Sequence, residues 1–218
     1  MKVRLAVFDC DGTLVDGQAA ICDAMEMAFG QAGMAPPARH RVRRIVGLSL
    51  PAAMRRLAPD SSEEELTLLV DSYKAAFFAA RSSGQLTEPL FDGIAPLLDG
   101  LRGAGWRLAV ATGKSDRGLK GCLAAHGLLD HFSSLQTADR HPSKPHPAML
   151  EQAMADIPAA PGDTVMIGDT AYDIEMAMAA GTRAIGVAWG YHAPDELLAA
   201  GAEAVAGSAD ELKELLDG

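Results

Sequence analysis

The sequence predicts an α/β fold in which a doubly wound parallel sheet carries an inserted helical domain. Two observations support this prediction. Short apolar segments alternate with helical segments in the second half of the chain, and residues 16–87 interrupt the alternation with helical patterns alone. Strands that alternate with helices form βαβ units, and such units build parallel sheets. The 218 residues are enough to bury a sizeable core.

Five short apolar segments are typical of strands buried in a parallel sheet. They cover residues 3–8, 106–112, 164–169 and 183–189, with 203–207 as a further candidate. Helical segments of suitable length lie between the later ones, at residues 116–129, 147–157 and 171–181. We therefore expect residues 1–15 and 88–218 to form one domain around a sheet.

Residues 16–87 show helical periodicity without a convincing strand. They are rich in Ala, Leu, Met and Glu, and prolines interrupt them at Pro36-Pro37, Pro51 and Pro59. We interpret this stretch as a small helical domain inserted after the first strand.

The composition limits the partners and the compartment. A formal net charge of −10 argues against a nucleic-acid-binding surface and against anionic membranes, although a small site can still be locally positive. Cys10, Cys22 and Cys122 lack metal-ligand spacing and are expected to stay reduced. The N-terminal segment lacks the pattern of a signal peptide, and no apolar run reaches the length of a membrane span. We expect a cytoplasmic monomer or homodimer.

Two aspartates follow the first predicted strand, in the segment "DCDGT". Asp9 and Asp11 lie one residue apart, and two carboxylates about 4 Å apart repel by about 4 kcal/mol at an effective dielectric constant near 20. A turn alone can explain such a motif, because Asp and Gly are common turn residues. If the motif is functional, however, a neighbouring group should offset the repulsion.

Three further polar groups follow a predicted strand or precede a predicted helix. Thr112, Gly113 and Lys114 follow the predicted strand 106–112, and Lys144 lies in "SKPHP" just before a predicted helix. Asp169 and Asp173, in "GDTAYD", follow the strand 164–169. Ligands of doubly wound sheets bind beyond the carboxyl ends of the strands, so we expect all these groups to meet in one crevice.

The chemistry of these groups suggests a cation and an anion bound together. Four carboxylates in one cleft require a cation, and hard oxygen ligands suit Mg²⁺. The positive charge of Lys144 is unfavourable at the N-terminus of a helix unless an anion binds at the same place. The turn after Thr112 offers further hydrogen-bond donors for that anion. Simpler roles stay open: Asp169 and Asp173 can cap a helix, and Lys144 can be solvated.

The four motifs, in this order, resemble those of the haloacid dehalogenase superfamily. The resemblance is carried by "DCDGT", Thr112 in "ATGKS", Lys144 in "SKPHP" and "GDTAYD". It is greatest to the phosphoglycolate-phosphatase-like members with a small helical cap. The resemblance implies a Rossmann-like catalytic core over residues 1–15 and 88–218, a cap over residues 16–87, and a phosphatase that uses Mg²⁺.

The resemblance also implies roles for individual residues. Asp9 would attack phosphorus and form an aspartyl-phosphate, and Asp11 would protonate the leaving alcohol and then activate water. Mg²⁺ would bind Asp9, the backbone carbonyl of Asp11 and Asp169, with Asp173 in support. The transferring phosphoryl group would be held by Thr112 and Lys144, at the place where the backbone amides of Gly113 and Lys114 are expected to add donors for the same anion.

Two features depart from the family pattern or are unusual. Gly17 stands where family members often have a serine, so a contact near the cap hinge would be missing. The basic run Arg39, His40, Arg41, Arg43 and Arg44 can contact an anionic substrate, or it can be the solvated face of a cap helix.

Several other functions are alternatives to a phosphatase. A phosphonoacetaldehyde hydrolase would need a lysine in the early cap, and the absence of lysine between Lys2 and Lys74 argues against that function. A haloacid dehalogenase would not need Asp169 and Asp173, so their presence argues against that function as well. A β-phosphoglucomutase-like transferase shares every core motif, and a phospho-receiver signalling domain also combines acidic residues, a threonine and a lysine. The loop 47–49 is small and largely apolar, which favours a small phosphomonoester, with 2-phosphoglycolate as the first candidate.

Overall fold

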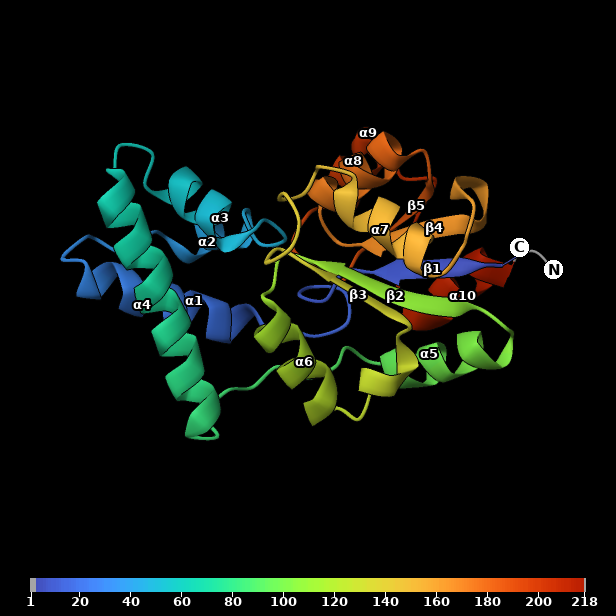
Figure 1. Ribbon diagram of the computed structural model, residues 1–218, viewed down its shortest axis with the longest axis horizontal. Coiled ribbons are helices and arrows are strands. Elements are labelled where there is room, and N and C mark those ends of the chain that lie inside the picture. Colours follow the sequence, from blue (N-terminus) through green and yellow to red (C-terminus); the bar gives the residue numbers. More distant parts are fainter. Residues whose placement is uncertain (1–2, 218) are drawn as a thin grey trace.

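The computed structural model describes residues 3–217 and contains one six-stranded parallel sheet. The strand order is β3-β2-β1-β4-β5-β6, the arrangement of a doubly wound sheet in which the chain reverses direction next to the first strand. The predicted fold class is confirmed. The strands, shown in Figure 1, are β1 (Leu5–Phe8), β2 (Arg107–Thr112), β3 (Ser134–Thr137), β4 (Thr164–Gly168), β5 (Arg183–Val187) and β6 (Ala204–Ala206).

Both faces of the sheet are covered by helices, because alternate side chains of each buried strand point to opposite faces. Ala6 and Phe8 pack with one group of helices, and Leu5 and Val7 pack with the other. The first face is covered by α5 (Ile94–Gly103), α6 (Asp116–Ala125) and α10 (Ala209–Asp217), and the second by α7 (Ala148–Asp156), α8 (Ala171–Ala180) and α9 (Pro194–Ala200), as Figure 1 shows.

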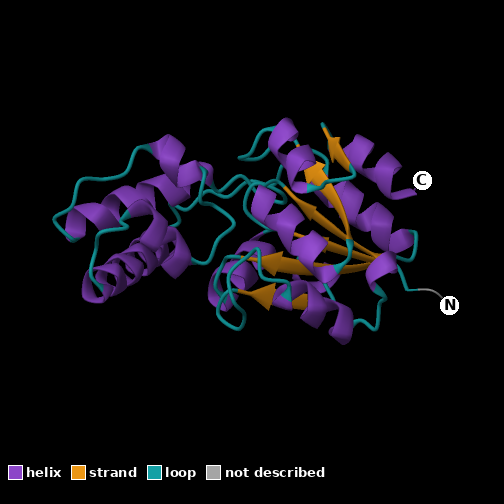
Figure 2. Cartoon of the chain, turned by 90° about the horizontal axis from the view of Figure 1, so that it is seen from above, coloured by secondary structure: helices purple, strands orange, loops and turns teal. Residues whose placement is uncertain are grey.

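Four helices between β1 and α5 pack around an apolar cluster of their own. Met54 and Leu69 are fully buried in it, and Ser62 forms a capping box with Glu65 that begins the longest of the four helices. We call this unit the helical cap. It lies beside the sheet and is reached through loops, as Figure 2 shows, and it consists of α1 (Gln18–Gln31), α2 (Arg39–Arg43), α3 (Leu50–Leu57) and α4 (Glu63–Ser82).

The structure adds one strand that the apolar pattern does not predict. β3 has the sequence Ser-Leu-Gln-Thr, and its polar side chains are buried because they bond to one another and to a neighbour. The Ser134 hydroxyl donates to Asp156 Oδ2 at 2.7 Å, and Gln136 Nε2 donates to the same oxygen at 2.7 Å. Helices α5, α9 and α10 are also additions to the predicted elements.

Two expectations from composition can be compared with the structure. Cys10, Cys22 and Cys122 are buried and form no disulfide, as expected for packing residues. Among residues 3–217, we find no helix with both the length and the apolar character needed to cross a membrane.

Candidate active site

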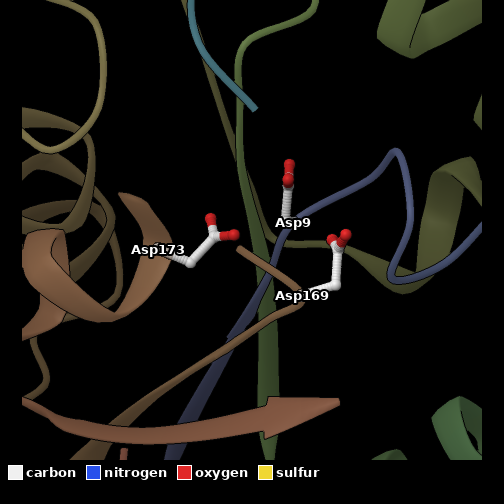
Figure 3. Close-up of side chains that lie close together, drawn as sticks. All are labelled: Asp9, Asp169 and Asp173. Carbon is white, nitrogen blue, oxygen red and sulfur yellow. The ribbon is translucent and has the colours of Figure 1, made fainter. Parts of the chain in front are cut away.

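Three buried carboxylates meet at the carboxyl ends of β1 and β4. Asp9 follows β1, Asp169 follows β4, and Asp173 lies in the first turn of α8; each offers an oxygen within 4.8 Å of the others. The three side chains lie close together in Figure 3 and are fully buried. Burial, opposed in part by Lys144, raises the pKa of Asp9 to about 7, and burial also raises the pKa of Asp169. Such a cluster favours a bound cation.

Hydrogen bonds fix the orientation of Asp169. Its Oδ1 accepts from the Thr13 hydroxyl at 2.9 Å, and its Oδ2 accepts from the Tyr191 backbone amide at 2.9 Å. Gly12 has a φ of +87°, and a Cβ there would lie 2.2 Å from Asp169 Oδ2. The glycine of "DCDGT" therefore makes room for a carboxylate from a different strand.

Asp173 caps helix α8, but Asp169 does not. Thr170 is the N-cap residue, and Asp173 Oδ2 accepts from the Thr170 amide at 3.1 Å and from its hydroxyl at 2.7 Å. The capping role considered for Asp173 is thus real. Its other oxygen, Oδ1, accepts from Lys144 Nζ at 2.6 Å, so this carboxylate also faces the cluster.

Lys144 is a buried cation within the carboxylate cluster. Its Nζ lies 2.6 Å from Asp173 Oδ1 and 3.0 Å from Asp9 Oδ1, and its side chain is fully buried. Burial alone would lower the pKa of Lys144, but the carboxylates of Asp173 and Asp9 raise it. The solvated-lysine interpretation is therefore wrong. Asp9 Oδ1 also accepts from the Cys10 amide at 2.6 Å, whereas Asp9 Oδ2 is buried without a hydrogen-bond partner among the described residues.

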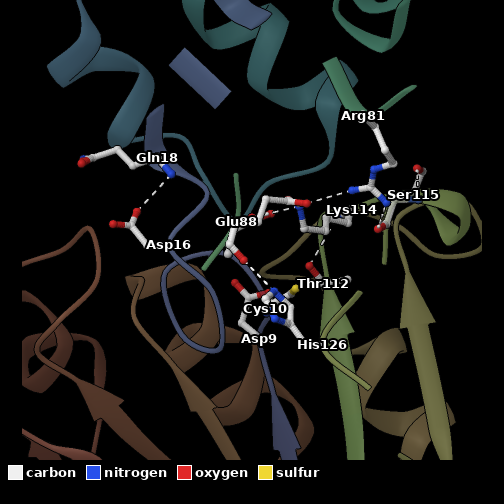
Figure 4. Close-up of polar contacts among 12 residues, drawn as sticks. Asp9, Cys10, Asp16, Gln18, Arg81, Glu88, Thr112, Lys114, Ser115 and His126 are labelled. Carbon is white, nitrogen blue, oxygen red and sulfur yellow. Dashed lines mark hydrogen bonds and ion pairs between the residues drawn. The ribbon is translucent and has the colours of Figure 1, made fainter. Parts of the chain in front are cut away.

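The fourth predicted carboxylate, Asp11, faces a different partner. Its Oδ1 lies 3.0 Å from Lys114 Nζ, and Lys114 Nζ also lies 2.7 Å from Glu88 Oε1. In Figure 4, dashed lines join Glu88 to Lys114 and to Arg81, and Lys114 lies near the end of β2. Three of the four predicted carboxylates therefore form one cluster, and the Asp11 side chain lies outside it.

The cap closely approaches the turn that follows β2. A Cβ on Gly113 would lie 2.3 Å from the Leu48 carbonyl oxygen, and the Ser49 amide donates to Ser143 Oγ at 2.8 Å. Thr112 is buried, and its Oγ1 accepts from the Lys114 amide at 3.3 Å. The loop 47–49 thus covers the carboxyl end of the sheet.

A cavity of about 400 Å³ lies between the cap and the strand ends. Its floor includes Asp9, Asp11, Thr112 and Gly113. Its walls are mainly apolar and include the cap residues Ile21, Met25, Ile45, Leu48, Tyr73, Phe77 and Phe78.

The unusual features of the sequence have structural explanations. A Cβ on Gly17 would lie 2.8 Å from Asp11 Oδ1, so the glycine leaves room for that carboxylate. Arg39 pairs with Asp23 and Glu26 of α1, and Arg44 pairs with Glu196 at 2.7 Å. The basic run does not line the cavity, and two of its arginines form ion pairs that join structural elements.

Comparison with known proteins identifies the family. The model of the haloacid dehalogenase-like hydrolases matches residues 6–187. The chain belongs to this family. It is 40% identical over 199 residues to the probable phosphatase IndB of Dickeya dadantii, covering 90% of this chain and 86% of that protein.

Other relatives carry two kinds of name. The chain is 33% identical to the tyrosine-protein kinase PtkA of Mycobacterium tuberculosis, covering 98% of this chain and 72% of that protein. It is 27% identical to the phosphoglycolate phosphatase of Nitrosococcus oceani, covering 98% and 96%. The crystal structure of a predicted phosphatase from Clostridium acetobutylicum is 27% identical, covers 99% of both chains and has a TM-score of 0.88.

These comparisons confirm the resemblance that the four motifs indicate. The chain is an enzyme of the phosphatase type within the haloacid dehalogenase-like hydrolases. A phospho-receiver signalling domain, the alternative from another class, does not fit this family membership.

Four residues at the site were missed by the sequence reasoning. Thr13 belongs to "DCDGT", so its position beside Asp9 and Asp11 was an available signal. Tyr191 contributes only a backbone amide, which no sequence pattern marks. Glu88 pairs with Lys114, and Arg81 of the cap pairs with Glu88, so both positions depend on how the cap packs on the sheet.

Proposed function

We propose that this chain is a Mg²⁺-dependent phosphomonoester hydrolase that works through an aspartyl-phosphate on Asp9. Its substrate is a small phosphorylated metabolite, with 2-phosphoglycolate as the first candidate. The observation that carries the proposal is the placement of Asp9 at the cavity floor. One of its oxygens is held by Lys144, and the other is buried without a partner among residues 3–217. We place the enzyme in the cytoplasm, where unpaired cysteines stay reduced.

The carboxylate cluster fits a divalent cation with hard oxygen ligands. Asp9 and Asp169 would hold Mg²⁺ together with the backbone carbonyl of Asp11. Asp173 uses both of its oxygens for Thr170 and Lys144, so it supports the site mainly through these partners. When bound, Mg²⁺ would neutralise charge and polarise a phosphoryl oxygen.

Catalysis takes place in two displacements at phosphorus. Asp9 Oδ2 attacks, the bond to the leaving oxygen breaks, and Asp11 gives its proton to that oxygen. Asp11 then takes a proton from a water molecule, which attacks phosphorus and releases phosphate and the Asp9 carboxylate. Lys144, Thr112 and the amides of the turn at Gly113 and Lys114 hold the phosphoryl oxygens as charge develops.

The structure of the cap favours a substrate with a small leaving group. Residues 16–87 approach the strand ends through the loop 47–49, which covers part of the cavity above the reacting atoms. This loop offers few donors for the hydroxyls of a sugar. A small phosphomonoester therefore fits better than a sugar phosphate.

Two phosphotransferase functions compete with hydrolysis. A β-phosphoglucomutase-like enzyme shares the core motifs, and the match to the tyrosine-protein kinase PtkA favours a protein acceptor. In both alternatives a hydroxyl group, rather than water, receives the phosphoryl group. The distinction therefore depends on the acceptor.

The test compares three mixtures, each with Mg²⁺. The first contains 2-phosphoglycolate, the second β-glucose 1-phosphate with a trace of the 1,6-bisphosphate, and the third ATP with a tyrosine-containing peptide. We expect free phosphate from the first mixture, no glucose 6-phosphate from the second, and no phosphopeptide from the third. The Asp9→Asn variant is the matched control and should be inactive. Rapid isomerisation or peptide phosphorylation without phosphate release from 2-phosphoglycolate would contradict the proposal.

A further inference from the structure

A row of charged groups connects the helical cap to Asp11. Arg81 Nη2 lies 2.8 Å from Glu88 Oε2, Glu88 Oε1 lies 2.7 Å from Lys114 Nζ, and Lys114 Nζ lies 3.0 Å from Asp11 Oδ1. Positive and negative groups alternate along the row. Arg81 belongs to the last turn of α4, Glu88 to the segment that leads back to the sheet, and Lys114 to the turn after β2.

The three groups nearest the sheet are shielded from water. The side chains of Glu88, Lys114 and Asp11 are 6%, 8% and 11% exposed, whereas Arg81 is 28% exposed. Ion pairs in such surroundings are weakly screened, and their geometry is held more firmly than that of surface pairs. The row is therefore a fixed part of the site rather than a set of solvated contacts.

Several contacts hold Lys114 and Glu88 in place. The Lys114 ammonium lies 5.3 Å from the centre of the Phe77 ring, which belongs to the cap. The Glu88 carbonyl oxygen lies 2.7 Å from His126 Nε2, and Arg81 Nη1 donates to the Gly118 carbonyl at 3.3 Å (Figure 4 shows His126 beside Glu88). Among residues 3–217, Lys114 is the one cation in an ion pair with Asp11.

We propose that Lys114 is a positioning residue for the acid and base Asp11. Its ammonium holds the Asp11 carboxyl at the cavity floor, where the leaving oxygen departs, and Glu88 and Arg81 fix that ammonium to the cap. The inference rests on the proposed function, in which Asp11 protonates the leaving group. It also assigns the Lys114 side chain a role that differs from the phosphate contact predicted for its backbone.

The position of Asp11 matters only when the leaving group needs a proton. An alkyl phosphate releases a strongly basic alkoxide and depends on the general acid, which typically contributes about 10²- to 10⁴-fold. The p-nitrophenolate ion leaves without such help. A variant that displaces Asp11 should therefore lose activity selectively on alkyl phosphates.

The experiment measures kcat/KM on 2-phosphoglycolate and on p-nitrophenyl phosphate. We expect Lys114→Met to lose about 10²-fold on the alkyl ester and much less on the aryl ester. Lys114→Arg should recover part of the loss, and Glu88→Gln should show a smaller selective loss. Lys120→Met, an exposed lysine on α6, is the matched control and should leave the ratio of the two values unchanged.

Equal losses on the two esters would overturn the proposal, because they would indicate a role in binding or folding. If the Lys114→Met protein does not fold, Glu88→Gln tests the same ratio of the two kcat/KM values.

A wild-type enzyme inactive on both esters would refute the proposed function instead. In that event, carbon-13 NMR of the aspartate carboxyls still tests the positioning: Lys114→Met should move the Asp11 signal, assigned with Asp11→Asn, and an unmoved signal would contradict it.

Discussion

Replacing Gly113 by alanine adds one methyl group at the closest approach of the cap to the sheet. The new Cβ would lie 2.3 Å from the Leu48 carbonyl oxygen and 2.7 Å from the Gly47 carbonyl oxygen. Both distances are shorter than the 3.4 Å at which ordinary contacts of a Cβ begin. Both neighbours are backbone atoms, so the loop 47–49 must retreat by about 1 Å rather than rotate a side chain away. The same movement strains the 2.8 Å hydrogen bond from the Ser49 amide to Ser143.

We expect Gly113→Ala to fold and to lose activity. The cap has its own apolar cluster, so it can shift as a unit without unfolding. A misplacement of about 1 Å near the reacting groups can cost about 10²-fold, and we predict a loss of this size in kcat/KM for 2-phosphoglycolate. The assay is phosphate release at several substrate concentrations, with thermal unfolding followed in parallel.

Gly103→Ala serves as the control, because a Cβ at Gly103 meets no atom of the described part of the chain within 4 Å. It should retain wild-type activity. Wild-type kcat/KM in Gly113→Ala would refute the argument that the closed position of the cap loop is needed for catalysis.

Three further predictions concern the metal, the buried cation and the core. Asp169→Ala should raise the Mg²⁺ concentration needed for half-maximal activity by about tenfold or more, and an unchanged requirement would exclude Asp169 as a ligand. Lys144→Met leaves two buried carboxylates without their cation, so the free energy of unfolding in urea should fall by about 3–5 kcal/mol without Mg²⁺; a change near zero would contradict the buried ion pairs. Leu98→Ala shortens a fully buried side chain of α5 and should lower the free energy of unfolding by about 2–5 kcal/mol. Leu68→Ala is the control: this residue is 48% exposed, so the free energy of unfolding should change little.

The sheet could be predicted because burial on both faces leaves a continuous apolar sequence. β1, β2, β4 and β5 are of this kind. β3 could not be predicted in this way, because Ser134 and Gln136 satisfy their polar groups through Asp156 of α7. Only the tertiary contact makes that segment suitable for a strand.

The carboxylate cluster followed from the sequence for a topological reason. Asp9 and Asp169 come directly after strands, and adjacent parallel strands end at the same edge of the sheet. The place of the Asp11 side chain could not be predicted in this way, because its partner Lys114 pairs with Glu88, and Glu88 pairs with Arg81 of the cap. Contacts between the cap and the sheet depend on how two units pack, and local sequence patterns do not encode that packing.

The most direct test of the account is to trap the covalent intermediate on Asp9. The enzyme is mixed with Mg²⁺ and 2-phosphoglycolate, quenched in acid during turnover and reduced with borohydride, which converts an aspartyl-phosphate to homoserine. Fragmentation of the N-terminal peptide in a mass spectrometer then distinguishes position 9 from position 11. We predict homoserine at position 9 in the wild type and none in Asp9→Asn. Homoserine at another aspartate, or none under conditions that trap acyl phosphates while phosphate is released, would contradict the role of Asp9 as the nucleophile.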